Sequence, residues 1–218
     1  DVEAVVLPIG GGGLAAGVAL AIKSRAPHVQ VIGVEADRAA CYSAAAAAGY
    51  PVAIECAPTL ADGLAVNQVG ALSFAIARQH LDRIVTVSEE QLALAILRLL
   101  EQEKSVVEGA GAAPLAACLG KALVDLAGKQ VVLVLCGGNI DPLILERVIE
   151  KGLVADGRLC RFTATISDRP GGLARLAQAI AATGASVKEV THDRAFSGPD
   201  VAAVNVFCTI ETIDREHI

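Results

Sequence analysis

Two runs of aliphatic residues pass directly into glycine clusters, and this pattern constrains the fold more than any other feature of the chain. Val2 to Ile9 leads into four consecutive glycines, and Gln130 to Cys136 leads into two more. Continuous aliphatic runs are typical of parallel strands that are buried on both faces. Open α/β sheets bind ligands outside the carboxyl ends of such strands. The sequence therefore predicts an α/β fold: an open parallel sheet with helices on both faces and a ligand site at the glycines.

The remaining pattern supports the same architecture. We expect further strands at 29–35 and 83–87, and helices at 14–25, 37–48, 71–80, 88–103 and 108–126. Only 3% of the residues are aromatic although 54% are hydrophobic, so the core must consist of small aliphatic side chains. Ser88, followed by three acidic or amide residues, predicts a capped start for one of the helices.

Charge and cysteine content exclude several classes of function. A net charge of -6 opposes nucleic-acid binding, which needs a basic surface. Charged residues interrupt every apolar run before it could span a membrane. The six cysteines form no CxxC pair and have no histidine at ligand spacing, so we expect no metal site and a reducing, cytoplasmic location.

The first glycine cluster predicts an anion site. Gly10 to Ala15 lies between an expected strand and an expected helix, where backbone N–H groups converge and the helix dipole favours negative charge. A phosphate is the usual occupant of such a loop. The same residues also fit the G-x-G-x-x-A pattern of dinucleotide-binding folds, with Glu35 in place to bind a ribose. An NAD-dependent dehydrogenase therefore remains an alternative.

Four motifs in order decide between these ligands. They are GGGGLAAG from Gly10, ADG from Ala61, EGAGA from Glu108 and CGGN from Cys136. Together they resemble the fold-type II pyridoxal-phosphate enzymes, in the group of threonine dehydratase (threonine ammonia-lyase), serine dehydratase and serine racemase, over residues 1 to about 151. The resemblance implies deamination of L-threonine to 2-oxobutanoate and ammonia by β-elimination of water. A serine dehydratase, a serine racemase or a non-catalytic amino-acid sensor are the alternatives.

The resemblance also assigns residues to the pyridoxal 5'-phosphate site. The cofactor phosphate would be held by backbone amides of Gly10, Gly11, Gly12, Gly13 and Leu14. Cys136 matches the residue beside the pyridine nitrogen, Glu108 matches a pocket carboxylate near the ring, and Gly63 matches a backbone position in the same pocket. Without the resemblance, Cys136 reads as a core cysteine and Glu108 as a carboxylate that stabilises a helix amino terminus.

The resemblance further implies a Schiff-base lysine in a segment upstream of the glycine loop. None of the lysines in this chain has that setting, so we expect no catalytic residue here and no activity from these 218 residues alone. Both ends look cut from a longer chain. Some relatives bind a cation near Glu35 to Cys41, but Ala39 and Ala40 replace the expected acid, which argues against a divalent site.

The residue pattern changes after Lys151 from continuous aliphatic runs to alternating apolar and polar residues, which predicts one domain at 1–152 and another at 158–218. Strands at 159–167, 186–191 and 201–212, a helix at 173–182 and a loop at 196–200 make the β-α-β-β start of a ferredoxin-like module. This tail resembles a truncated ACT domain, which implies homo-oligomers and an amino-acid effector, isoleucine, near Asp168, Gly171, Gly172 and Leu173. A purely structural oligomerisation domain is the alternative. We expect the four histidines, at positions 28, 80, 192 and 217, on the surface without partners.

Overall fold

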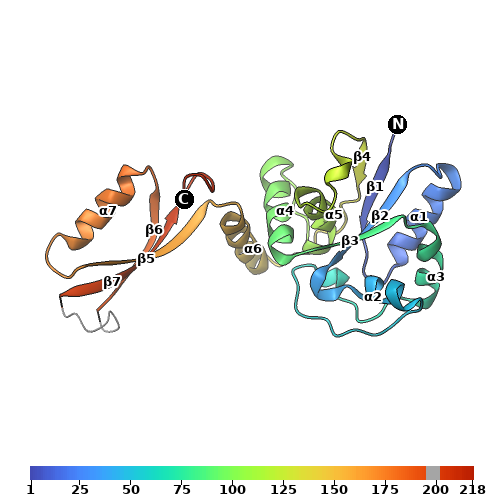
Figure 1. Ribbon diagram of the computed structural model, residues 1–218, viewed down its shortest axis with the longest axis horizontal. Coiled ribbons are helices and arrows are strands. Elements are labelled where there is room, and N and C mark those ends of the chain that lie inside the picture. Colours follow the sequence, from blue (N-terminus) through green and yellow to red (C-terminus); the bar gives the residue numbers. More distant parts are fainter. Residues whose placement is uncertain (195–201) are drawn as a thin grey trace. The chain divides into compact units, whose positions relative to one another are not determined.

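The computed structural model describes residues 1–194 and 202–218 (Figure 1). The chain forms two compact units, Asp1–Gly152 and Leu153–Ile218. None of the helices in the described part of the chain is long and apolar enough to cross a membrane.

The first unit contains the predicted open parallel sheet. Its strands are β1 (Ala4–Pro8), β2 (Gln30–Ala36), β3 (Arg83–Val87) and β4 (Val131–Leu133), in the order β3-β2-β1-β4. All three neighbouring pairs run parallel, and Val5 of β1 lies opposite Val31 of β2 and Val132 of β4. The helices are α1 (Gly13–Arg25), α2 (Cys41–Ala48), α3 (Ala71–His80), α4 (Glu89–Gln102), α5 (Gly109–Leu119) and α6 (Pro142–Ala155), and the short 3-10 turns are η1 (Asp37–Ala39), η2 (Asp62–Leu64) and η3 (Val124–Leu126). The boundary between the two units falls within α6, after Gly152.

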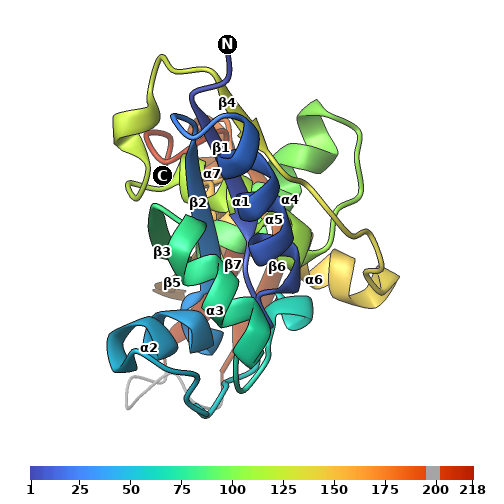
Figure 2. The same cartoon turned by 90° about the vertical axis from the view of Figure 1, so that its right-hand side faces the viewer.

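Helices cover both faces of this sheet, which confirms the predicted α/β fold. Successive residues of a strand point to opposite faces. Ala4 and Val6 therefore pack with α4 and α5, whereas Val5 and Leu7 pack with α1, α2 and α3. In Figure 2, α1 and α3 lie in front of the strands. The aliphatic content of the sequence is thus divided between two buried layers.

Local hydrogen bonds explain where two helices begin. Ser88 Oγ accepts the N–H of Gln91 at 3.3 Å while Gln91 Oε1 accepts the N–H of Ser88 at 2.8 Å, so the predicted capped start of α4 is confirmed. The helix predicted from residue 37 is instead divided at Ala40 into η1 and α2. The carboxylate of Glu35 accepts the N–H groups of Tyr42 and Ser43, at 2.7 and 2.9 Å, and so starts α2 afresh.

Two elements are shorter than predicted. The helix expected as far as residue 126 ends at Leu119, because Gly120 adopts an extended conformation and the next helical turn is the separate η3. The strand expected at 130–136 pairs only over Val131–Leu133. The remaining residues up to Cys136 form part of the loop at the carboxyl edge of the sheet.

The second unit is a small antiparallel sheet with one helix. It consists of β5 (Leu159–Ser167), α7 (Gly172–Ala182), β6 (Ser186–Asp193) and β7 (Ala203–Glu211), and its strand order is β5-β7-β6. Since β7 is antiparallel to both neighbours, β5 and β6 run parallel to each other with β7 between them, which is a split β-α-β arrangement. The predicted loop at 196–200 lies outside the described residues.

Candidate functional site

The loop between β1 and α1 gathers unpaired backbone donors. Gly12 has φ of 86°, a left-handed conformation that favours glycine, and it turns the chain into the first residue of α1. The N–H groups of Gly10, Gly11 and Gly12 donate to no acceptor among the residues that the structure describes. The first N–H groups of any α-helix also lack an acceptor within the helix. The loop therefore presents adjacent donors and the positive end of a helix dipole to the same space.

This glycine loop forms one wall of a cavity of about 260 Å³, which we call the glycine cavity. All eight residues that the sequence analysis assigned to the cofactor line it: Gly10, Gly11, Gly12, Gly13, Leu14, Gly63, Glu108 and Cys136. Five further residues complete the lining: Pro8, Ala15, Leu64, Ala110 and Gly137. The structure thus brings four segments together that are widely separated in the sequence.

Glu108 links two of these segments. Its Oε2 accepts the N–H of Asn139 at 2.9 Å, and its own N–H donates to the carbonyl oxygen of Gly137 at 3.2 Å. Glu108 is the residue before α5, but its side chain makes no hydrogen bond with the first turn of that helix. Its carboxylate therefore holds the turn after Cys136 and lines the cavity at the same time.

Close backbone contacts explain the glycines of the EGAGA motif. A Cβ atom on Gly109 would overlap the carbonyl oxygen of Leu60, and one on Gly111 would overlap the carbonyl oxygen of Cys136. The start of α5 is therefore wedged between the segment before Gly63 and the end of the loop after β4. Only glycine permits this approach, because any other residue would force one of these backbones to move.

Glu89 supports the same wall, a role that its place in the sequence does not reveal. Its carboxylate accepts the N–H of Leu60 at 2.8 Å and the hydroxyl of Thr59. In the sequence Glu89 looks like an ordinary acidic residue in the first turn of a helix. No local pattern shows that its partners lie about thirty residues earlier in the chain.

Burial sets the protonation of Cys136. Removal from water raises the pKa of its thiol above the usual range, and the nearby carboxylate of Glu108 raises it further. The thiol is therefore neutral at physiological pH and can either donate or accept a weak hydrogen bond.

Glu35 is not available to a ligand in this cavity. Its side chain has no exposed surface, and its carboxylate accepts hydrogen bonds from the backbone of Tyr42 and from the backbone and hydroxyl of Ser43. Burial raises its pKa although these hydrogen bonds act in the opposite direction. The dehydrogenase hypothesis required this carboxylate to bind a ribose, and the structure uses it to start α2 instead.

The second unit has a cavity of its own, of about 450 Å³. Three of the four predicted effector residues, Asp168, Gly171 and Leu173, line it. Gly172 does not line it; this residue is buried, and its N–H donates to the carbonyl oxygen of Arg169 at 3.0 Å. The single Nε–H of Arg194 is shared between the two carboxylate oxygens of Asp168, at 3.0 and 2.8 Å, and this guanidinium lowers the pKa of the carboxyl.

Two histidines have partners that the sequence did not predict. His192 lines the cavity of the second unit, with Nε2 at 3.8 Å from Asp168. His217 Nδ1 accepts the N–H of Ile213 at 3.0 Å, and its Nε2 lies 2.8 Å from the carbonyl oxygen of Thr183. The expectation that all four histidines lack partners is therefore wrong, since nothing in the local sequence indicates these long-range contacts.

Comparison with known proteins agrees with the resemblance. The family model described as "Pyridoxal-phosphate dependent enzyme" matches residues 1–137. Over all 218 residues the chain is 44% identical to an L-threonine ammonia-lyase of Thermotoga maritima and 46% identical to one of Geobacter sulfurreducens, and it covers 54% of each. The chain thus spans about half the length of these relatives.

A solved structure shows the same fold. The processed form of threonine deaminase isoform 2 from Solanum lycopersicum superposes with a TM-score of 0.66 at 33% sequence identity, over 69% of this chain and 44% of that one. The family model covers more than half of the chain, including the glycine loop, Gly63 and Glu108. The chain therefore belongs to the family of pyridoxal-phosphate-dependent enzymes.

Proposed function

We propose that the natural protein deaminates L-threonine to 2-oxobutanoate and ammonia, and that this chain supplies the pocket for the phosphate and ring of pyridoxal 5'-phosphate. One observation carries the proposal: the eight residues assigned from the resemblance, drawn from four distant segments, line a single cavity. The two ammonia-lyases that match the whole chain support threonine as the substrate.

The residues of the cavity fit this cofactor. The unpaired N–H groups of Gly10, Gly11 and Gly12, together with the start of α1, suit the phosphate dianion. When bound, pyridoxal phosphate supplies an electron sink that stabilises negative charge at the substrate Cα while the β-hydroxyl leaves. Cys136 contributes a neutral thiol and so places no negative charge beside the ring nitrogen. Glu108 orients the turn that presents Cys136.

We assign the proton transfers of the reaction to residues outside this chain. The resemblance assigns the Schiff-base lysine to a segment upstream of the glycine loop, and we propose no catalytic residue within these 218. The part of this chain is to bind the phosphate, to set the charge near the ring and to keep the pocket wall in place.

A substitution at Gly11 tests the proposal. A Cβ there would meet no atom within 4 Å, so Gly11→Asp should fold while placing a carboxylate where the phosphate would lie. We expect the natural protein to be yellow and to form 2-oxobutanoate from L-threonine. Gly11→Asp should weaken cofactor binding at least about a hundredfold, because like charges in contact cost several kcal/mol, whereas Gly11→Ala should change it little. A colourless natural protein that forms no 2-oxobutanoate would overturn the proposal, as would unchanged binding in Gly11→Asp.

Serine is the competing substrate. Serine dehydratases and serine racemases belong to the same group as threonine dehydratases. The ratio of kcat/KM for threonine to that for serine, with an assay for D-serine, decides between them. A preference for serine would replace threonine deamination by serine deamination or racemisation.

We also propose that the second unit is an ACT-like regulatory module of a cytoplasmic homo-oligomer, with isoleucine as its effector. The split β-α-β sheet and the cavity beside Gly171 support this. An effector acts only through different affinities for two states of the enzyme. Isoleucine and valine should therefore be titrated against the initial rate, in the natural protein and in Gly171→Leu. If the natural protein ignores both while the unit still mediates assembly, the unit is only structural.

A further inference from the structure

A second cavity of the first unit, of about 370 Å³, lies apart from the glycine cavity and shares no lining residue with it. It is formed by α2, α3 and the start of β3, and its walls include Tyr42, Phe74, Arg78, Leu81, Asp82 and Ile84. Nothing in the proposed deamination uses these residues.

The hydroxyl of Tyr42 lacks a partner inside the protein. Tyr42 is only 1% exposed, and within residues 1–194 and 202–218 its hydroxyl is the only buried side-chain N or O atom without a hydrogen-bond partner. Buried polar groups in folded proteins nearly always have a partner. Burial raises the pKa of this hydroxyl to about 12, with a further contribution from Glu35, so the group keeps its proton and has a hydrogen bond left to donate.

Arg78 supplies a cation to the same cavity. Its guanidinium lies over the ring of Phe74, 5.7 Å from the centroid, and its Nη1 donates to the carbonyl oxygen of Gly49 at 3.3 Å. In the described part of the chain no carboxylate lies within ion-pair distance of Arg78. Tyr42 and Arg78 both pack against the ring of Phe74, and both line the cavity.

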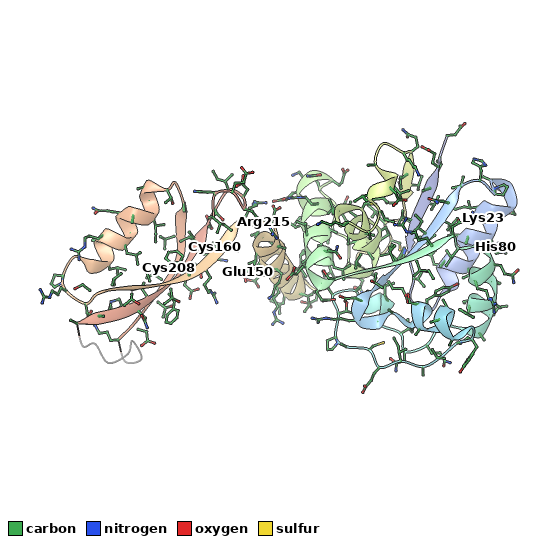
Figure 3. The ribbon with its side chains drawn as sticks, viewed as in Figure 1. Lys23, His80, Glu150, Cys160, Cys208 and Arg215 are labelled. Atoms are coloured by element: carbon green, nitrogen blue, oxygen red, sulfur yellow. The ribbon has the colours of Figure 1, made fainter. Side chains whose placement is uncertain are left out.

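The other charged residues of the cavity are already neutralised. Asp82 pairs with Lys23 at 2.7 Å and also accepts the N–H of Val31 at 2.7 Å; Figure 3 labels Lys23, which lies in the last turn of α1. Arg83 pairs with Asp125 at 3.0 Å. Among the described residues, Arg78, whose side chain is exposed, is therefore the charged residue of this cavity that has no carboxylate partner.

The remaining walls are apolar. Phe74 packs against Tyr42 with their ring centroids 5.5 Å apart, and Leu81 and Ile84 contribute aliphatic side chains. A ligand that suits these walls has a single anionic head and a short aliphatic body.

We propose that this cavity binds a small aliphatic monocarboxylate, with its carboxylate between the guanidinium of Arg78 and the hydroxyl of Tyr42 and its body against Phe74, Leu81 and Ile84. The site is independent of the glycine cavity and of the reaction proposed for it. The carboxylate would accept a hydrogen bond from the hydroxyl of Tyr42, which otherwise has no partner, and would serve as the counter-ion of Arg78.

Calorimetric titration of the holoenzyme with isobutyrate tests the site, because isobutyrate has no amino group that could react with the cofactor. We expect saturable binding that weakens at least about tenfold in Arg78→Gln, which loses a charge-assisted hydrogen bond, and about three- to tenfold in Tyr42→Phe, which loses a neutral one. Arg25→Gln is the matched control, since Arg25 is an exposed arginine at the end of α1, outside the cavity.

The outcomes separate cleanly. Absence of saturable binding overturns the proposal, as does binding that Arg78→Gln and Tyr42→Phe leave unchanged, because the probe would then occupy another site. Inorganic phosphate is titrated in parallel. If phosphate binds in an Arg78-dependent way and isobutyrate does not, the site takes an inorganic anion and the monocarboxylate assignment is wrong.

Discussion

At the scale of single residues, burial controls the protonation of two groups with different roles. Glu35 is fully buried and its carboxylate starts α2, whereas Cys136 is partly buried and lines the glycine cavity. In both cases removal from water is the largest cause of a raised pKa. The two shifts have different consequences: one bears on stability and the other on the chemistry of the pocket.

The raised pKa of Glu35 predicts a pH-dependent stability. The folded protein binds this proton at a higher pH than the unfolded chain, whose glutamate has a pKa near 4.5. The stabilisation that comes from protonated Glu35 is therefore fully present below pH 4.5 and is lost as the pH rises through the pKa of this group in the folded protein. In urea titrations, the free energy of unfolding of the wild type should fall relative to that of Glu35→Gln from pH 4.5 toward neutral pH. A difference that stays constant with pH would contradict the prediction.

Cys136 gives a prediction about the pocket. A serine hydroxyl can make the same hydrogen bonds as the neutral thiol, so Cys136→Ser should keep cofactor affinity and deamination rate within about threefold. Cys136→Asp would add a carboxylate near Glu108 and, by favouring a protonated ring, should lower the deamination rate about tenfold or more. Both rates and both affinities are measured on the holoenzyme. Equal rates for the wild type and Cys136→Asp would show that this side chain does not face the ring.

At the scale of secondary-structure elements, α5 organises the glycine cavity. Its start contacts the carbonyl oxygens of Leu60 and Cys136 through two glycines, and Glu108 just before it binds the turn at Asn139. The position of this helix therefore determines how far apart two walls of the cavity lie.

Alanine substitutions in two helices test this role of α5. In Gly111→Ala the added Cβ would overlap the carbonyl oxygen of Cys136, and we expect the free energy of unfolding to fall by about 1–3 kcal/mol with weaker cofactor binding. Gly17→Ala in α1 is the control, because a Cβ there meets no atom within 4 Å. It should stabilise the protein by about 0.5–1 kcal/mol, since alanine loses less entropy than glycine in a helix. Equal effects of the two substitutions would refute the close contact.

The elements also show how far the sequence predicts the structure. Local periodicity was sufficient for α3 and β3, which have the predicted bounds. It failed after Leu119, where apolar residues continue although the helix has ended, and at Ala40, where the break depends on the carboxylate of Glu35. The eight cofactor residues came from the motifs, and their contact with the cofactor stays a prediction. The support from Glu89 depends on a contact that no motif contains.

At the scale of the whole molecule, the two units differ in the size of their cores. The first unit has two buried layers, one on each face of a four-stranded sheet. The described core cluster of the second unit contains only four buried side chains, those of Ile180, Val204, Val206 and Cys208. Small cores bury a smaller fraction of the chain and provide less stability.

The second unit should therefore unfold at a lower urea concentration than the first. Val206→Ala removes two methyl groups from its core and should shift only this earlier transition, by about 1–3 kcal/mol. Val34→Ala, at a fully buried position of β2, is the matched substitution in the first unit and should shift only the later transition. The two transitions are followed by far-UV circular dichroism and by the reaction of cysteine thiols that become exposed on unfolding. A single transition that both substitutions shift equally would show that the units unfold together.

The wedged start of α5 has a consequence for natural sequence variation. Gly109 and Gly111 carry no reactive atom, yet each lies against a backbone carbonyl that leaves no room for a methyl group. Selection at these two positions would act on the shape of the chain and leave no freedom to drift. At Cys136, in contrast, we expect a serine to be tolerated. Beside this cavity, the positions that we expect to be least open to evolutionary change are therefore those that contribute no side chain.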